Sequence, residues 1–482
     1  MRPAIISLIA RQFFKTAFKN KAVLVLTVLI GFMLIMATII GWNHFYKQQE
    51  LRTRYQQLVR KQWESNPDKH PHRMAHYGHF AFRPKHPLSF FDFGMENYTG
   101  VSLFLEAHKQ NTVNFSEANF STGILRFGEI SIAMILLLLV PLLLLFLGFN
   151  TVSALRENGT LKMILCQGVS WQELILGKAT GLTGVAFVLY APVMLLTVVL
   201  WAFLSHMQAS GDDVLRLFVL LLSYFIYFII WALMAVLVSA FSRTSKGSLT
   251  TLIGVWLLLM IVLPRAAQAF GAQQYPAPSK AAFEARLEED LRKDGERHDP
   301  DDPHFKAVKD SVLKHHGVDS VEKLPFNYAG FLMYEGEKIS STIYNHHQAE
   351  LMRTYEKQNS FNRYTGFINP YIAVKNFSMA LTGADFASYR DFGEQAEVYR
   401  YQLAQTMNEL QIKHISNRKP GPNDEPYKIS NGHWQQFPDF VYRFRKVDSV
   451  FRNEVLSVAA MICWIVLLTV LLFTAAKKIK AI

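Results

Sequence analysis

Histidine is the side chain with the clearest capacity for chemistry in this 482-residue sequence, which contains sixteen of them. Four lie within ten residues of one another: His70, His72, His76 and His79. Imidazole is a common metal ligand, and a four-residue spacing places two side chains on one helical face. Pro71 and the run Arg83-Pro84-Lys85-His86-Pro87 indicate a loop, however, and carboxylates are sparse nearby. We therefore interpret these histidines as solvated or locally hydrogen-bonded, and expect no metal ligand here.

Sequence signatures of hydrolysis and of nucleotide binding are missing. His347-x-x-Glu350 does not have the spacing of a zinc protease motif, and no Gly-x-x-x-x-Gly-Lys-Ser/Thr loop occurs. Two cysteines, Cys166 and Cys463, exclude a disulfide scaffold and a cysteine-based zinc site. We expect that the chain is not an enzyme, that it has no catalytic residue and that it binds no cofactor itself.

The most informative polar residues lie between 156 and 178. Gly159 would end one helix, and Thr160 would cap a short new one. The new helix would carry three apolar residues on one face: Leu161, Ile164 and Leu165. Ser170-x-x-Glu173 has the form of a capping box, in which two residues satisfy each other's backbone at a helix start. This pattern predicts a short amphipathic helix that lies across a membrane face and suits docking against a soluble partner.

The stretch 156–178 lies between long apolar segments, which must hold it in place. Half of the residues are apolar or aromatic and only 18% are charged, which is typical of an integral membrane protein. A membrane-spanning helix needs about 20 apolar residues. Six segments meet that requirement: 22–42, 130–149, 179–204, 214–240, 248–269 and 456–475. We expect an all-α integral membrane protein with six transmembrane helices.

Orientation follows from the basic residues of short segments, which favour the cytoplasm. Thirteen Lys and Arg residues against two Glu fall in four such segments: 1–21, 150–178, 241–247 and 476–482. Both termini are therefore expected in the cytoplasm. The net charge of +12 is explained by this topology and by attraction to anionic membrane lipids, so we expect no nucleic-acid partner. Two long segments, 43–129 and 270–455, would be extracytoplasmic, and the second reads as a mainly helical domain.

The arrangement resembles the permeases of ABC transporters of the ABC-2 type. These have an amphipathic elbow helix before the first span, here within residues 1–21, and a coupling helix between spans two and three. Their pattern is met in this sequence by Glu157, Gly159, Thr160, Leu161, Ser170, Glu173, Leu174, Gly177 and Lys178. The whole chain is similar to a bacterial subgroup with enlarged outer segments, judged from stretches at residues 81–100 and at Asn369-Pro370-Tyr371.

The resemblance implies the membrane subunit of an ATP-driven exporter in the bacterial cytoplasmic membrane. ATP would be bound by a separate ABC ATPase subunit, and a second copy of the permease or a related permease would complete the pathway. Two alternatives remain open. In one, the spans relay force to a periplasmic or envelope partner without transport. In the other, the chain is a membrane-anchored metal-handling protein that uses its histidine-rich outer segment.

Overall fold

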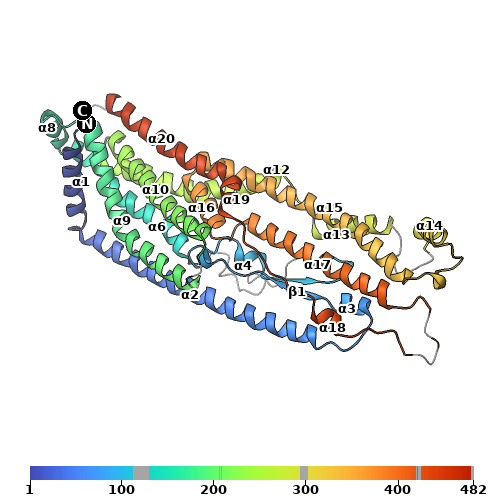
Figure 1. The fold of residues 1–482 in the computed structure, drawn as a ribbon. Coiled ribbons are helices and arrows are strands. Elements are labelled where there is room, and N and C mark those ends of the chain that lie inside the picture. The colour runs from blue at the N-terminus through green and yellow to red at the C-terminus, as the bar shows by residue number, and fades with distance from the viewer. Residues whose placement is uncertain are drawn as a thin grey trace.

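The chain forms an elongated, mainly helical molecule (Figure 1). The computed structural model describes residues 1–111, 130–205, 207, 209–293, 302–418, 421 and 425–478, and 77% of it is helical. The predicted segment 43–129 and the predicted tail 476–482 therefore lie partly outside the described residues. One part of the molecule, the membrane half, contains the long apolar helices. The other, the polar half, contains the charged helices and a small sheet.

The membrane half consists of α1 (Pro3–Ala17), the start of α2 (Lys21–Glu64), α6 (Ile132–Gly148), α7 (Ser153–Glu157), α8 (Thr160–Cys166), α9 (Trp171–Leu204), α10 (Gly211–Phe241), α11 (Ser245–Leu257), the π-helix η3 (Leu258–Val262), α12 (Leu263–Gln274) and α20 (Val455–Lys478). Helices α16 (Pro370–Leu381) and α19 (Val447–Asn453) lie where the two halves meet (Figure 1).

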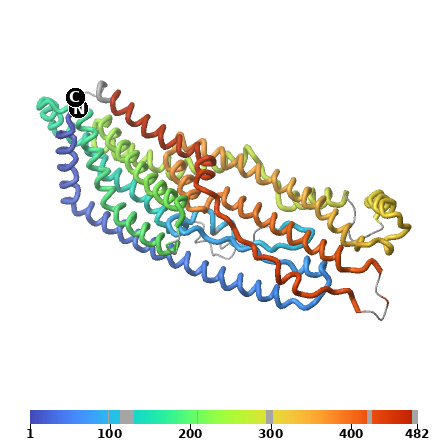
Figure 2. Tube along the Cα trace, in the orientation of Figure 1, coloured from blue at the N-terminus to red at the C-terminus, as the bar shows by residue number. Residues whose placement is uncertain are grey.

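The polar half consists of the rest of α2, α3 (Pro71–Tyr77), β1 (His79–Phe82), η1 (Pro87–Phe90), α4 (Glu96–Thr99), β2 (Ser102–Leu105), α13 (Lys280–Lys293), η4 (Pro303–Phe305), α14 (Lys306–His316), η5 (Val321–Lys323), α15 (Tyr328–Tyr364), η6 (Thr365–Phe367), α17 (Phe386–His414) and α18 (Gly432–Gln435). The C-terminal half of α20 lies near α1 and α8, at the end of the molecule opposite α14 (Figure 2).

Six helical stretches of the described chain are long and apolar enough to cross a membrane: Lys21–Glu64, Ile132–Glu157, Trp171–Leu204, Gly211–Phe241, Ser245–Gln274 and Val455–Thr474. Each overlaps one of the six predicted apolar segments, so the expectation of a multi-pass helical membrane protein is confirmed at this level. Five of the six stretches are longer than the predicted segments, because they continue beyond the apolar run.

Helix α2 shows this extension most clearly. Its apolar part ends near Trp42, where we placed the end of the first span, but the helix continues to Glu64. No glycine or proline occurs between Trp42 and Pro67, and the stretch is rich in helix-favouring Gln, Glu, Arg and Lys. At about 1.5 Å per residue, this 44-residue helix is about 66 Å long. It runs from the membrane half into the polar half without interruption (Figure 1).

Helix α10 lies at the centre of the membrane half, in contact with α6, α9, α11, α16 and α20. Its two tyrosines, Tyr224 and Tyr227, are buried, and their hydroxyl groups find partners inside the bundle. The hydroxyl of Tyr227 donates to the Leu137 carbonyl at 2.9 Å, and that of Tyr224 lies 2.9 Å from the Ser378 hydroxyl on α16. A buried tyrosine needs such a partner to offset its desolvation. These residues therefore hold the helix bundle together.

The polar half is organised by the pairing of α15 with α17. Strands β1 and β2 form an antiparallel hairpin, the only sheet among the described residues, in which Phe80 pairs with Phe104. Helix α3 packs against α17. Our interpretation of the segment around His72 and His76 as a loop is wrong. Pro71 occupies the first turn of α3, where its missing N–H costs nothing, so it starts a helix here.

Candidate functional site

Helices α7 and α8 and the first turn of α9 form the end of the molecule at which the predicted coupling residues gather (Figure 1). Between α7 and α8, Gly159 adopts a φ of +76°. Nothing lies within 4 Å of the position that a Cβ would take there, so backbone conformation rather than space requires glycine. Gly159 itself is the N-cap of α8 and Thr160 is its first helical residue, which corrects our assignment of Thr160 as the cap.

Helix α8 is amphipathic, with one covered face and one open face. Leu161 is fully buried, and Ile164 and Leu165 are partly buried. The opposite face is exposed and comprises Lys162, Met163, Cys166 and Gln167. Met163 is 58% exposed although it is apolar. We refer to these four residues as the α8 docking face. The sequence identified the covered face, but it singled out none of the four exposed residues.

The predicted capping box at the start of α9 is present. The Ser170 hydroxyl accepts a hydrogen bond from the Glu173 backbone N–H at 3.2 Å, and the Glu173 carboxylate accepts one from the Ser170 N–H at 2.9 Å. The Arg2 guanidinium also donates to the same carboxylate, at 2.9 and 3.0 Å. A further donor is the Arg2 backbone N–H, at 2.7 Å. Glu173 therefore ties the α8–α9 turn to the start of α1.

Helix α1 covers the first turns of α9 by close packing. A Cβ on Gly177 would lie 2.7 Å from the Cβ of Ile9, a separation that real side chains do not adopt. The Lys178 ammonium lies 5.5 Å from the ring centre of Phe13, within the range of a cation–π contact. Leu174 is buried in the same region. Gly177 and Lys178 thus contact α1, and Leu174 is buried.

Glu157 makes the second connection of this region. Its carboxylate accepts hydrogen bonds from the backbone N–H and the hydroxyl of Ser245, in the first turn of α11. A carboxylate at a helix N-terminus is favourable, because the first N–H groups of a helix have no intrahelical partner. The neighbouring Arg156 donates to the carbonyls of Ala240 and Ser242 at the end of α10. Helix α7 is therefore bound to both α10 and α11.

The predicted coupling residues separate into two groups in the structure. The residues of the first group are buried at the α8 end or make contacts within it: Glu157, Leu161, Ser170, Glu173, Leu174, Gly177 and Lys178. Gly159 is exposed and Thr160 is half-buried. Arg2 is the main residue that sequence reasoning missed, since it was counted only as a basic residue. Arg2 is the N-cap residue of α1, but its side chain makes no capping bond there, so no local signal indicates its contact with Glu173.

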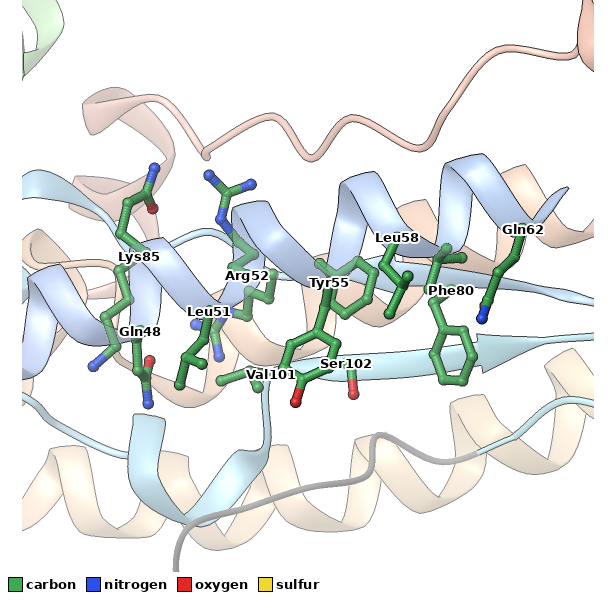
Figure 3. Close-up of a pocket in the computed structure, with 14 residues that line it drawn as sticks. Gln48, Leu51, Arg52, Tyr55, Leu58, Gln62, Phe80, Lys85, Val101 and Ser102 are labelled. Carbon is green, nitrogen blue, oxygen red and sulfur yellow. The ribbon is translucent and has the colours of Figure 1, made fainter. Parts of the chain in front are cut away.

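A second feature is an apolar groove of about 530 Å³ beside the polar extension of α2 (Figure 3). Leu51, Tyr55 and Leu58 of α2 and Phe80 of β1 are among the residues that line it. Three cationic residues, Arg52, Arg83 and Lys85, are also in the lining. Lys85 is paired with Glu96 at 3.1 Å. The groove begins a few residues beyond the apolar part of α2.

Residues 280–443 match the family model of a domain of unknown function, DUF3526. This domain is found in permeases that resemble those of ABC transporters. The match covers α13 to α17 and the segment after them, which is most of the polar half and none of the α8 end. No curated protein matches the chain.

Proposed function

We propose that the chain is the membrane subunit of an ATP-driven transporter of the ABC-2 type, and that a separate ATPase subunit binds the α8 docking face. The observation that carries the proposal is the two-sided environment of α8. Its inner face is buried, whereas its outer face is exposed and presents Met163 next to Lys162. Methionine is enriched in protein–protein interfaces, so an exposed Met163 on a short helix whose other face is buried supports docking of a partner there.

The connections of this region provide a path for force. Glu157 and Arg156 join α7 to α10 and α11, and Glu173 joins α9 to α1 through Arg2. Because these contacts are hydrogen-bonded and partly buried, a displacement of α8 would move several spans together. The ATPase would supply that displacement when it binds and hydrolyses ATP. The occurrence of DUF3526 in related permeases also supports this function.

In this proposal the protein resides in the bacterial cytoplasmic membrane, with the α8 end and both termini in the cytoplasm. The thirteen basic residues of the four short segments support that orientation. A second copy or a related permease would complete the pathway. The groove beside α2 supports export of a cargo with an apolar chain, because it offers such a chain a continuous apolar wall.

The decisive experiment uses the full chain purified together with the ATPase that accompanies it. ATP hydrolysis is measured in proteoliposomes for wild type, for Met163→Asp and for Val398→Asp. Val398 is the matched control, because it is equally exposed on a helix but lies on α17. Stimulation should be lost in Met163→Asp and kept in Val398→Asp. Absence of any co-purifying ATPase, or unchanged stimulation in Met163→Asp, would refute the proposal.

Orientation is tested with the natural cysteine of the docking face. Cys166 is exposed on α8, and Cys463 is exposed on the apolar helix α20. In a Cys463→Ser background, a membrane-impermeant maleimide should label Cys166 in inside-out vesicles and not in intact spheroplasts. Labelling in spheroplasts would place the α8 end outside the cell and contradict the coupling role.

A second candidate function is force transmission to an envelope partner without transport. It is favoured by α2, which forms one unbroken helix from beside α1 to the far part of the polar half. A rigid helix of this length transmits a tilt at one end to the other. ATP-dependent change in the distance between spin labels on the polar half, without lipid or solute movement, would favour this function. Co-purified lipid that is lost in Leu58→Asp would favour transport.

A further inference from the structure

We propose that His72, His76 and His108 form a binding site for a zinc ion. The imidazoles of His72 and His76 come from one face of α3, and His108 comes from the turn that follows β2. One ligand atom from each of the three residues lies within 4.8 Å of the other two. The pattern in the sequence contained only the first two histidines, because the third is 32 residues further along the chain.

The geometry suits tetrahedral coordination. The Nε2 atoms of His72 and His76 are 3.2 Å apart. With Zn–N distances of about 2.0–2.1 Å, two nitrogens of a tetrahedral site are separated by about 3.3 Å. The ring of His108 lies 5.6 Å from that of His72 and 5.3 Å from that of His76, measured between ring centres. A small inward movement of the His108 ring would bring all three nitrogens to bonding distance.

A buried carboxylate positions the third histidine. Glu337 on α15 lies 2.8 Å from Nδ1 of His108, and it also accepts the His108 backbone N–H at 3.1 Å. With Nδ1 facing this carboxylate, Nε2 would be the metal ligand, and the carboxylate would orient the ring. This arrangement of carboxylate, histidine and metal is the usual one in zinc proteins. Glu337 is in turn held by Arg400 of α17 at 2.8 Å.

The backbone at His108 is also unusual. Its φ is +62°, in the left-handed region that residues with a Cβ seldom adopt. The turn is closed by an antiparallel bridge between Glu106 and Lys109, and the contacts to Glu337 hold the strained residue in place. Glycine or asparagine would be accommodated more easily in such a turn. The contacts of its backbone and ring with Glu337 hold His108 in this conformation and thereby set the position of the ring.

Three histidines and an open fourth position favour zinc that exchanges with solution. His76 is exposed, so the fourth position faces solvent and would be filled by water or by a group from a partner. Structural zinc sites are usually closed by four protein ligands, whereas sites with three ligands keep one position free. Bound zinc would also connect α3 and the β1–β2 hairpin to α15 and α17 through Glu337.

The test measures zinc binding to the full chain in detergent, purified without a histidine tag. Wild type, His76→Ala, His72→Ala and the control His315→Ala are stripped with chelator, dialysed against zinc and analysed for metal content. His315 is an exposed histidine of α14 outside the cluster. We expect one zinc per chain in wild type and His315→Ala, and a loss of affinity of at least 100-fold in the two cluster variants.

Cobalt substitution tests the coordination geometry of the bound metal independently. Co²⁺ in a tetrahedral site with nitrogen ligands absorbs strongly in the visible range, whereas octahedral Co²⁺ absorbs weakly. Wild type and His315→Ala should show the strong bands and His76→Ala should not. His76 is exposed, so its replacement is compatible with folding, which the thermal unfolding midpoint checks. Equal zinc content in His76→Ala and wild type, or weak cobalt bands in wild type, would overturn the proposal.

Discussion

Two buried carboxylates, Glu173 and Glu337, each bind an arginine from a distant part of the sequence, but in different surroundings. At the α8 end, the Glu173 side chain is 3% exposed, whereas that of its partner Arg2 is 55% exposed. In the polar half, Glu337 and Arg400 are 1% and 2% exposed. Burial disfavours the charged form of Glu337, yet the hydrogen bond from His108 and the charge of Arg400 outweigh it and hold its pKa below the usual value.

The difference suggests distinct roles for the two ion pairs. Separating Arg2 from Glu173 costs little, because water can replace the lost contact and Ser170 still binds the carboxylate. Separating Arg400 from Glu337 would leave the Glu337 carboxylate in a dry interior with His108 as its remaining partner. The α8 end is therefore tied to α1 by a solvent-screened ion pair in addition to close packing at Gly177, whereas the centre of the polar half is closed by a desolvated ion pair. Four predictions test this comparison.

The largest effect is expected from Arg400→Met. This replacement leaves Glu337 buried without its main counter-charge and should lower the free energy of unfolding by about 3–5 kcal/mol. Thermal unfolding in detergent, followed by tryptophan fluorescence, measures it. Arg292→Met is the control, because Arg292 and its partner Glu288 are both exposed and their pair contributes little. Similar shifts for the two variants would show that the buried pair is not stabilising.

A smaller effect is expected where α1 packs on α9. Gly177→Ala introduces a methyl group 2.7 Å from Ile9 and should cost about 1–3 kcal/mol through overpacking. Gly184→Ala is the matched control on the same helix, because its Cβ would lie 3.4 Å from Phe14, an ordinary contact. The thermal midpoint should fall for Gly177→Ala and stay or rise for Gly184→Ala. Equal behaviour would mean that α1 is not held by close packing.

Arg2→Ala should alter coupling more than stability. The guanidinium is exposed and its charge is screened by solvent, so the thermal midpoint should change little. Stimulated ATP hydrolysis in proteoliposomes should nevertheless decrease, because α1 is no longer tied to the α8–α9 turn. Arg11→Ala removes an exposed charge from the same helix and serves as the control. If both variants retain full stimulation, the contact between Arg2 and Glu173 has no part in coupling.

The smallest effect is expected in the pH dependence of stability. It arises from Asp439, which lies in the segment after α18 and contacts Arg60 of α2. The hydrogen bond from His79 holds the pKa of Asp439 below its usual value, and Arg60 acts in the same direction while burial opposes it. A carboxyl group with a lowered pKa adds stability above about pH 3.9 and loses it as the pH falls through the folded-state pKa. Wild type should therefore lose slightly more stability than Asp439→Asn below pH 4, by less than about 1 kcal/mol. Parallel pH profiles would contradict this.

Several local features could be predicted because their causes lie within a few residues. The capping box of Ser170 and Glu173 spans four positions, and the covered face of α8 follows from helical periodicity. Six long apolar stretches could be recognised from hydropathy alone. The continuation of α2 to Glu64 also had a local signal, the lack of glycine and proline, which hydropathy does not report.

Other features could not be predicted because they depend on which distant segments meet. Nothing near His108 in the sequence indicates that its ring faces α3, since that requires the β1–β2 hairpin to fold back on α17. The same holds for Arg2 and Glu173, which are 171 positions apart. The pattern of Gly177 and Lys178 was recognisable, but its contact with α1 was not.

The sequence by itself determined the helical class, the six apolar stretches and the turn chemistry around α8, because hydropathy, periodicity and capping act over a few neighbouring residues. Tertiary structure alone decided which α8 side chains are exposed, which carboxylates are desolvated and which histidines converge. Those properties depend on long-range packing, in which a contact forms only when two remote segments exclude water from the same place.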